Sequence, residues 1–322
     1  MIGKVSPEEL KKYVFSRIGK KSDSVLVGPA YGEDTAAIKI GEQILAINSD
    51  PIIFAADQIG TLGVNIASND VAASGADPQW LTTIYLLPAN DGDKLDTITK
   101  QVNQISNKLG IAVIGGHSEF VPILDRPFLG LTCFGVTDKF IPTGGAKPND
   151  AIILTKGAGI EGTGIIATDF YSEVKKVVSK KVLEDGKKKL DKLSVIPESE
   201  ILRKYANSMH DPTEGGIVDG LLELAMASNL RLDIQRNKII TSEDTKELCE
   251  AVNVDPLKIF GSGALVASVT QEYATQALDE LDKAHVPATI IGYAKEGDEP
   301  VLKIDGKKYQ KPIRDQLYDL WD

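Results

Sequence analysis

The sequence alternates between segments typical of strands and segments typical of helices, and this alternation constrains the fold more than any other feature. In the first half, apolar runs with strand character are separated by longer runs with helical periodicity. The strand-like runs are 36–40, 43–48, 80–87, 111–114 and 128–136, and the helix-like runs are 60–74 and 94–109. This alternation predicts an α/β or α+β fold.

A stretch rich in glycine and proline, from Pro142 to Asp150, divides the chain. Such composition is typical of a domain boundary, so we expect one unit over residues 1–140 and a second over 150–322. The second unit begins with an apolar run after the boundary and continues with helices and further strands. Its strand-like runs are 151–155, 230–234, 263–269 and 288–294, and its clearest helix is 216–228.

The composition excludes several classes of protein. The chain has 322 residues, with 36 Lys and Arg against 46 Asp and Glu, which gives a net charge of −10. This acidic balance argues against a nucleic-acid partner. Cys133 and Cys249 are too isolated for a disulfide scaffold or a zinc site, so both are expected in the core of a cytoplasmic protein. No apolar run reaches the ~20 residues of a membrane-spanning helix, so no membrane association is expected.

Four acidic residues stand where apolar segments meet small residues: Asp34, Asp50, Asp70 and Glu119. A carboxylate is costly to remove from water unless positive charge compensates it. Lys and Arg are nearly absent from these segments, which favours a hard dication such as Mg²⁺. Any single one of these acids is better explained as a helix cap or turn former, but four together favour the ion.

Glycine-rich segments form a second pattern. Gly115-Gly116 follows a predicted strand, and 157–164 has several glycines between a strand and a helix, where backbone amides can hold phosphate or simply form a tight turn. His210-Asp211 precedes Gly215-Gly216 at a predicted helix N-terminus, where an anion or a metal-bound phosphate is favoured. His117 and His210 are candidate acids or bases in these loops.

Five motifs in a fixed order resemble the aminoimidazole ribonucleotide (AIR) synthase, or PurM-related, superfamily. These are Gly32–Ala37, Asn48–Asp50, Asn69–Pro78, Gly115–Glu119 and His210–Gly216. The chain looks most similar to the HypE-like branch, which serves hydrogenase maturation. The resemblance implies two PurM-like α/β domains. The first would bind ATP and pair with a second copy, so that the homodimer shares a β-barrel.

The resemblance also implies Mg-ATP chemistry on a small-molecule or carbamoyl-type oxygen. With the residue patterns, it assigns ATP binding, magnesium ligation and catalysis to overlapping sets. The ATP set is Asp34, Asp50, Asn69, Asp70, Gly115, Gly116, Glu119 and Asp211; the magnesium set is Asp34, Asp50, Asp70 and Asp211; the catalytic set is Asp50, His117 and His210.

One departure from the HypE pattern concerns the acceptor. HypE proteins end in a cysteine that is modified, whereas this sequence ends in Leu317–Asp322 without one. The leading hypothesis is therefore an Mg-ATP-dependent enzyme with a different acceptor. A second hypothesis is a nucleotide-binding maturation protein that works with a partner protein and turns over little ATP. A third is a metal-dependent hydrolase that uses no ATP.

Overall fold

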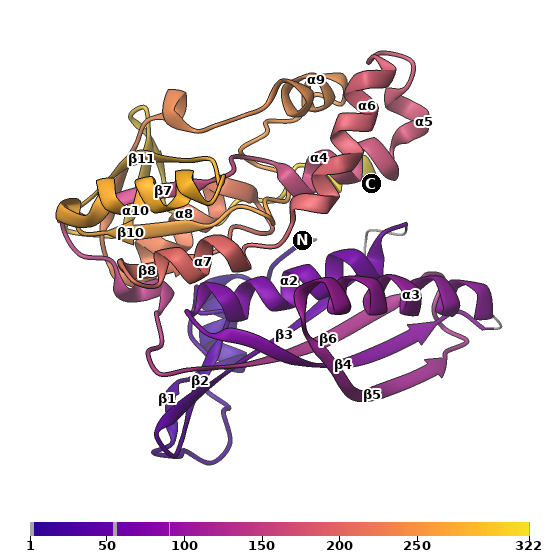
Figure 1. Cartoon of the computed structure of the whole chain (residues 1–322), viewed down its shortest axis with the longest axis horizontal. Helices are drawn as coiled ribbons and strands as arrows, with labels where there is room; N and C mark the ends of the chain where they lie inside the picture. Colours follow the sequence, from indigo (N-terminus) through magenta and orange to yellow (C-terminus); the bar gives the residue numbers. More distant parts are fainter. Residues whose placement is uncertain (1–2, 54–56, 90, 322) are drawn as a thin grey trace.

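The computed structural model describes residues 3–53, 57–89 and 91–321. The outermost residues of the two predicted units, 1–2 and 322, lie outside this part of the chain. Two β-sheets form, one from each half of the sequence, with helices packed on them and α2 (Ile59–Ala73) between the halves (Figure 1). The mixed α/β prediction is confirmed.

The first sheet contains the strands of the first half in the order β1-β2-β3-β6-β4-β5. The strands are β1 (Val25–Val27), β2 (Ala36–Ile40), β3 (Gln43–Ile52), β4 (Asp77–Leu87), β5 (Ala112–Phe120) and β6 (Phe128–Thr137). Neighbours are antiparallel except β4 and β5, which are parallel and joined by α3 (Gly92–Leu109). A parallel pair requires such a crossover. β1 and β5 are the open edges of this sheet.

The second sheet is built from the other half of the chain, in the order β13-β12-β9-β11-β7-β10-β8. Its strands are β7 (Ala151–Thr155), β8 (Ala206–His210), β9 (Arg231–Ile234), β10 (Val266–Val269), β11 (Ala288–Lys295), β12 (Val301–Ile304) and β13 (Lys307–Tyr309). All of β7 and β10 is buried. These two strands form the centre of the second core, and β7 begins at the residue where the sequence predicts it.

Helices cover this sheet and complete the chain. They are α4 (Ile160–Thr168), α5 (Tyr171–Val174), α6 (Lys180–Lys187), α7 (Ile196–Leu202), α8 (Gly216–Ser228), α9 (Glu243–Ala251), α10 (Gln271–Lys283) and α11 (Tyr318–Trp321), with the short 3₁₀ turns η2 (Thr143–Gly145), η3 (Lys188–Lys192) and η4 (Arg236–Lys238). Within the described residues, no helix combines the length and the apolarity that a membrane span requires.

Most polar residues of α2 are buried together with its apolar residues, because both sides of this helix are covered. Almost all of its residues are buried, because the first sheet packs on one side and α7 and β8 of the second half pack on the other. Small residues allow this close approach: a Cβ on Gly63 would lie 2.6 Å from the Leu131 side chain. Asn69 and Asp70 are thereby held at the junction of the two halves.

Local capping signals set the ends of two helices. At α1 (Pro7–Glu9), which continues into the π-helical turn η1 (Leu10–Val14), the Ser6 hydroxyl accepts from the Glu9 amide, and Ser6 donates to the Glu9 carboxylate. α3 ends at Gly110, whose left-handed φ of 72° is readily adopted by glycine.

Two predicted strand ends are wrong. β3 continues past Asp50 to Ile52. β2 pairs with β3 only as far as Ile47, so the missing amide hydrogen of Pro51 removes no hydrogen bond between these two strands. β5 continues through Gly115 and Gly116 to Phe120, because β4 pairs with it along this length. The glycine pair is therefore extended strand rather than a turn, and a Cβ on Gly116 would lie 1.8 Å from the Thr83 carbonyl oxygen.

Candidate functional site

Four aspartates that are far apart in the sequence converge at the junction of the two halves. Asp34 precedes β2, Asp50 lies in β3, Asp70 in α2, and Asp211 directly follows β8. Burial raises the pKa of Asp70 well above its usual range, and the neighbouring charges of Asp211, Asp50 and Asp34 raise it further. Carboxyls that affect one another in this way share one site.

A cavity of about 10 Å³, lined by Asp34, Asp70, His210 and Asp211 among others, lies within this cluster. It has room for one water-sized atom. Asp211 is only 1% exposed, and neither of its carboxylate oxygens has a hydrogen-bond partner among the described residues. Burial, with the charges of Asp34 and Asp50, raises the pKa of Asp211 to about 7, although the charge of His210 lowers it.

The donor set and the unpaired Asp211 oxygens suit a hard cation that prefers oxygen ligands. In the part of the chain that the structure describes, however, no three His, Cys, Asp or Glu side chains are grouped closely enough to hold a metal ion. The aspartates therefore provide a cation-attracting cluster rather than a complete metal shell.

A chain of paired side chains extends from this cluster into the second half. His210 Nδ1 lies 3.4 Å from Asp34 Oδ2, and His210 Nε2 lies 3.0 Å from Glu223 Oε2 on α8. Lys4 then donates from Nζ to Glu223 Oε1 at 2.9 Å. Asp34 is 40% exposed, whereas the side chains of His210 and Glu223 are buried. We refer to Asp34, His210, Glu223 and Lys4 as the polar chain.

The charges along the polar chain stabilise one another. Burial alone would lower the pKa of His210, but its hydrogen bond to Glu223 and the charge of Asp34 raise it to about 9. Burial alone would raise the pKa of Glu223, but Lys4 and His210 lower it to about 2. His210 is therefore a cation at neutral pH, positioned between two carboxylates.

Lys4 and Glu223 are functional candidates that the sequence analysis did not identify. Glu223 had a readable signal, because Asp219 and Glu223 are four residues apart in an otherwise apolar helix and so lie on one face of α8. Lys4 had none, since it reaches the site only through the fold. It also supplies part of the positive charge that we expected to come from an ion alone.

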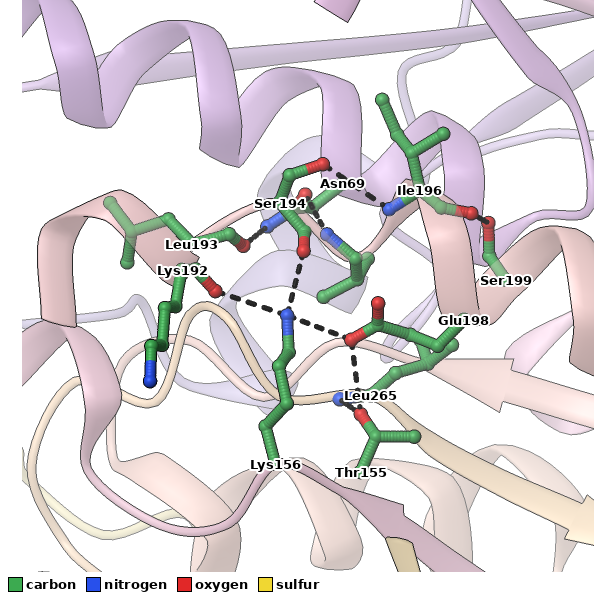
Figure 2. A network of polar contacts seen from close by, with 11 residues as sticks. Asn69, Thr155, Lys156, Lys192, Leu193, Ser194, Ile196, Glu198, Ser199 and Leu265 are labelled. Carbon is green, nitrogen blue, oxygen red and sulfur yellow. Dashed lines mark hydrogen bonds and ion pairs between the residues drawn. The ribbon is translucent and has the colours of Figure 1, made fainter. Parts of the chain in front are cut away.

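Asn69 forms contacts with the second half of the chain that its position in the sequence does not predict. Its amide group donates from Nδ2 to the Leu193 carbonyl at 2.9 Å and accepts from the Val195 amide at 2.9 Å (Figure 2). Both contacts are buried. Asn69 thus joins α2 to the 192–195 segment of the second half, and its assignment to nucleotide binding stays a prediction.

Lys156 holds the same segment from the other side. Its Nζ donates to the carbonyls of Lys192 and Ser194 and lies 2.8 Å from Glu198 Oε1 (Figure 2). Glu198 also accepts from the Thr155 hydroxyl, which in turn accepts from the Leu265 amide. The junction between the halves is therefore fixed by a connected network of hydrogen bonds.

His117 and Glu119 lie apart from the aspartates. They are on β5, where His117 Nε2 is 3.2 Å from Glu119 Oε2, and their side chains are 63% and 60% exposed. In the described chain, no hydrogen bond or ion pair connects either residue to the four aspartates. Gly115 and Gly116 lie on the same edge strand. A single copy of the chain therefore assembles the predicted site only in part.

The glycine-rich turn over 157–164 uses its amides within the chain. Ala158 donates to the Ile240 carbonyl and Gly162 to the Phe260 carbonyl. At the start of α8, the Gly215 amide likewise donates to Asp315. For 157–164, these pairings favour the tight-turn interpretation over phosphate binding, while at 210–216 anion binding stays a prediction.

Family models match both halves of the chain. The N-terminal domain model of AIR synthase related proteins matches residues 32–137, and the C-terminal domain model matches residues 147–305. The chain belongs to the AIR synthase-related family.

Relatives within this family have several activities. A Methanocaldococcus jannaschii protein named for hydrogenase expression/formation is 29% identical over 93% of this chain and 90% of its own. The carbamoyl dehydratase HypE of Rhizobium leguminosarum bv. viciae is 26% identical over 83% of this chain and 78% of its own. A thiamine-monophosphate kinase of Pyrococcus horikoshii is 26% identical over 88% and 89%.

Solved structures share the fold. The hydrogenase maturation protein HypE in complex with ATP superposes with a TM-score of 0.70 at 22% identity, over 95% of this chain and 91% of that one. A ThiL protein complexed with AMPPCP and TMP has a TM-score of 0.72 at 20% identity, over 88% and 91%. The PurM-like fold is thus confirmed.

Proposed function

We propose that this protein is an Mg-ATP-dependent enzyme that transfers the γ-phosphoryl group of ATP to an oxygen of a small-molecule or carbamoyl-type acceptor. The observation that carries the proposal is the buried Asp211 carboxylate, unpaired beside Asp70 in the aspartate cluster. Support comes from related structures that contain ATP or AMPPCP.

In this proposal, Asp34, Asp50, Asp70 and Asp211 attract Mg²⁺ without enclosing it. One or two of these carboxylates would bind the ion, ATP phosphate oxygens and water would complete its shell, and the ion would neutralise phosphate charge. The transfer breaks the bond between Pγ and the β,γ-bridging oxygen, forms a bond between Pγ and the acceptor oxygen, and releases ADP. His210 is the cation of the site and orients Asp34, whose partly exposed carboxylate is available to accept the proton of a hydroxyl acceptor.

The acceptor is a separate molecule in this proposal. Both cysteines are buried, and burial raises the pKa of each thiol to about 12. Neither is therefore a nucleophile at neutral pH. The tail is held in the second half, where Trp321 packs against Phe170 and Phe260.

We also propose that the protein is a homodimer in which β5 pairs with a second copy. Every residue of β5 is exposed, and the apolar side chains of Val113, Ile114 and Phe120 are 45%, 58% and 46% exposed. An open apolar edge strand favours pairing with another chain. Such pairing would bring His117 and Glu119 to the site of the partner copy and close the sheet into a shared barrel.

Calorimetric titration with Mg²⁺ and a non-hydrolysable ATP analogue tests the function. We expect Asp70→Asn and Asp211→Asn to weaken binding at least a hundredfold, because each removes a carboxylate that could bind the cation. Asp279→Asn, at an exposed position of α10, is the matched control and should bind like the wild type. Wild-type affinity in both cluster variants would refute the proposal.

The alternative is a nucleotide-binding maturation protein with little turnover of its own. A specific observation favours it: a single copy leaves His117 and Glu119 outside the site, and HypE has been solved as a complex with HypF. Phosphate release measured with the chain alone distinguishes the two. Sustained release without a partner protein excludes the alternative.

A further inference from the structure

A second cavity lies outside the aspartate cluster, between the N-terminal helical turns and α8. Its volume is about 590 Å³, within the range of ~300–1,000 Å³ that is common for small-molecule sites. The lining comes from three places in the sequence. Lys11 and Phe15 belong to the N-terminal segment, Pro29, Ala30 and Tyr31 to the loop before β2, and Met226 to α8.

The lining of this N-terminal cavity has a clear chemical character. Phe15, Pro29 and Met226 provide apolar and aromatic surface. Lys11 is the only charged residue among those that line it, although the chain as a whole carries a net charge of −10. No described acidic residue pairs with Lys11. An apolar body and one negative charge are therefore the features that a ligand needs.

Tyr31 connects this cavity to the polar chain. Its hydroxyl is buried and has no hydrogen-bond partner among the described residues. Burial raises the pKa of Tyr31, and the charges of Glu223 and Asp219 raise it further, so the hydroxyl lies within the field of the polar chain. Tyr31 thus lines the cavity and at the same time lies close enough to Glu223 and Asp34 for their charges to act on its hydroxyl.

We propose that the N-terminal cavity binds the acceptor substrate, and that this acceptor is an amphipathic small molecule with an aromatic or aliphatic body and one anionic group. The assignment rests on the proposed phosphoryl-transfer function. Lys11 pairs with the anionic group, Phe15 and Met226 contact the body, and Tyr31, three residues before Asp34, lines the part of the cavity that lies towards the polar chain.

Fluorescence titration of the full chain with 8-anilinonaphthalene-1-sulfonate, an aromatic anion, tests the site. We expect saturable binding at one site, weakened at least tenfold by Lys11→Glu and abolished by Ala30→Trp, which fills the cavity from an exposed position. Lys12→Glu is the control, because Lys12 is exposed and lies over the Tyr13 ring instead. N-phenyl-1-naphthylamine, which has no sulfonate, should bind with less than a threefold change in Lys11→Glu.

Equal binding of the sulfonate to wild type, Lys11→Glu and Ala30→Trp would overturn the cavity assignment. Asp70→Asn should leave this sulfonate binding intact. Wild-type nucleotide affinity in both Asp70→Asn and Asp211→Asn would refute the proposed function without affecting the cavity, so the two failures are distinguishable. The acceptor role is tested by measuring whether the two ligands affect each other's binding. In the wild type, saturating sulfonate should change the affinity for the Mg-bound ATP analogue at least threefold. In Ala30→Trp it should not. Identical nucleotide affinity with and without sulfonate would overturn that role.

Discussion

Lys4 and Glu223 form an ion pair at 2.9 Å although they are 219 residues apart in the sequence. Glu223 is buried and also contacts His210, so the pair fixes the far end of the polar chain that begins at Asp34. The first residues of the described chain are thus part of the candidate site.

Removing the ammonium group of Lys4 should destabilise the fold. We expect Lys4→Met to lower the free energy of unfolding by about 1–2 kcal/mol, less than for a fully buried pair because Lys4 is 35% exposed. Urea denaturation measures this change. In a double-mutant cycle with Glu223→Gln, the coupling energy should be about 1 kcal/mol or more. A coupling energy near zero would show that the ion pair contributes nothing to stability. Lys12→Met is the control for a general loss of surface charge.

Stability should fall as pH rises through neutrality. The folded-state pKa of Asp211 is about 7, above the unfolded value of ~3.9. The folded protein therefore binds this proton more tightly, and the resulting stabilisation is complete below pH ~4 and lost as pH approaches and passes 7.

The corresponding variant separates Asp211 from other titrating groups. Asp211→Asn cannot ionise, so its melting temperature should exceed that of the wild type by about 2–4 °C or more at pH 8, and by less at pH 5. Thermal unfolding at both values measures this difference. An equal offset at pH 5 and pH 8 would contradict the raised pKa. Mg²⁺ should likewise stabilise the wild type more at pH 8.

Asn69 should matter for stability more than for nucleotide binding. Asn69→Ala leaves a buried carbonyl and a buried amide of the 193–195 backbone without partners, which costs about 2–4 kcal/mol. Denaturation measures the loss, with exposed Asn103→Ala in α3 as the control. If the folded variant binds the ATP analogue within tenfold of wild type, Asn69 is structural; a hundredfold loss would instead support the nucleotide-binding assignment.

The exposed edge strand makes the dimer testable. Ile114→Lys places a charge on β5 without changing a buried contact, since Ile114 is 58% exposed. We expect sedimentation to show a dimer for the wild type and a monomer for this variant, together with at least tenfold weaker nucleotide binding. Ile123→Lys, at a more exposed position beyond β5, should remain dimeric. A monomeric wild type would exclude the shared barrel.

The sequence predicts the elements whose signals are local. The break between β2 and β3 at residues 41–42, the end of α3 and the start of β7 each depend on neighbouring residues. The structure has all three where the sequence places them. The length of β5 depends instead on pairing with β4, which periodicity over 111–114 does not reveal.

The same distinction applies to the site. Asp34, Asp50 and Asp70 are readable because each is an acid beside apolar or small residues, and the structure brings them together with Asp211 of the 210–216 motif. Glu119 has the same local signal but lies on exposed β5, apart from the aspartates. Two other contacts exist only once the halves have packed. They join Lys4 to Glu223 and Asn69 to the 193–195 backbone. No local pattern in the sequence encodes them.

The start of α8 receives contacts from both extremities of the described chain. Lys4 donates its backbone amide to Glu214, while the Gly215 amide donates to Asp315 and the Ile313 amide donates to Asp219. A ribosome must therefore have synthesised residues 313–315 before this helix can complete its bonds. Until then Gly215 and Asp219 lack these two partners, so the helix that contributes Glu223 to the polar chain is fully bonded only when almost all of the chain has been made.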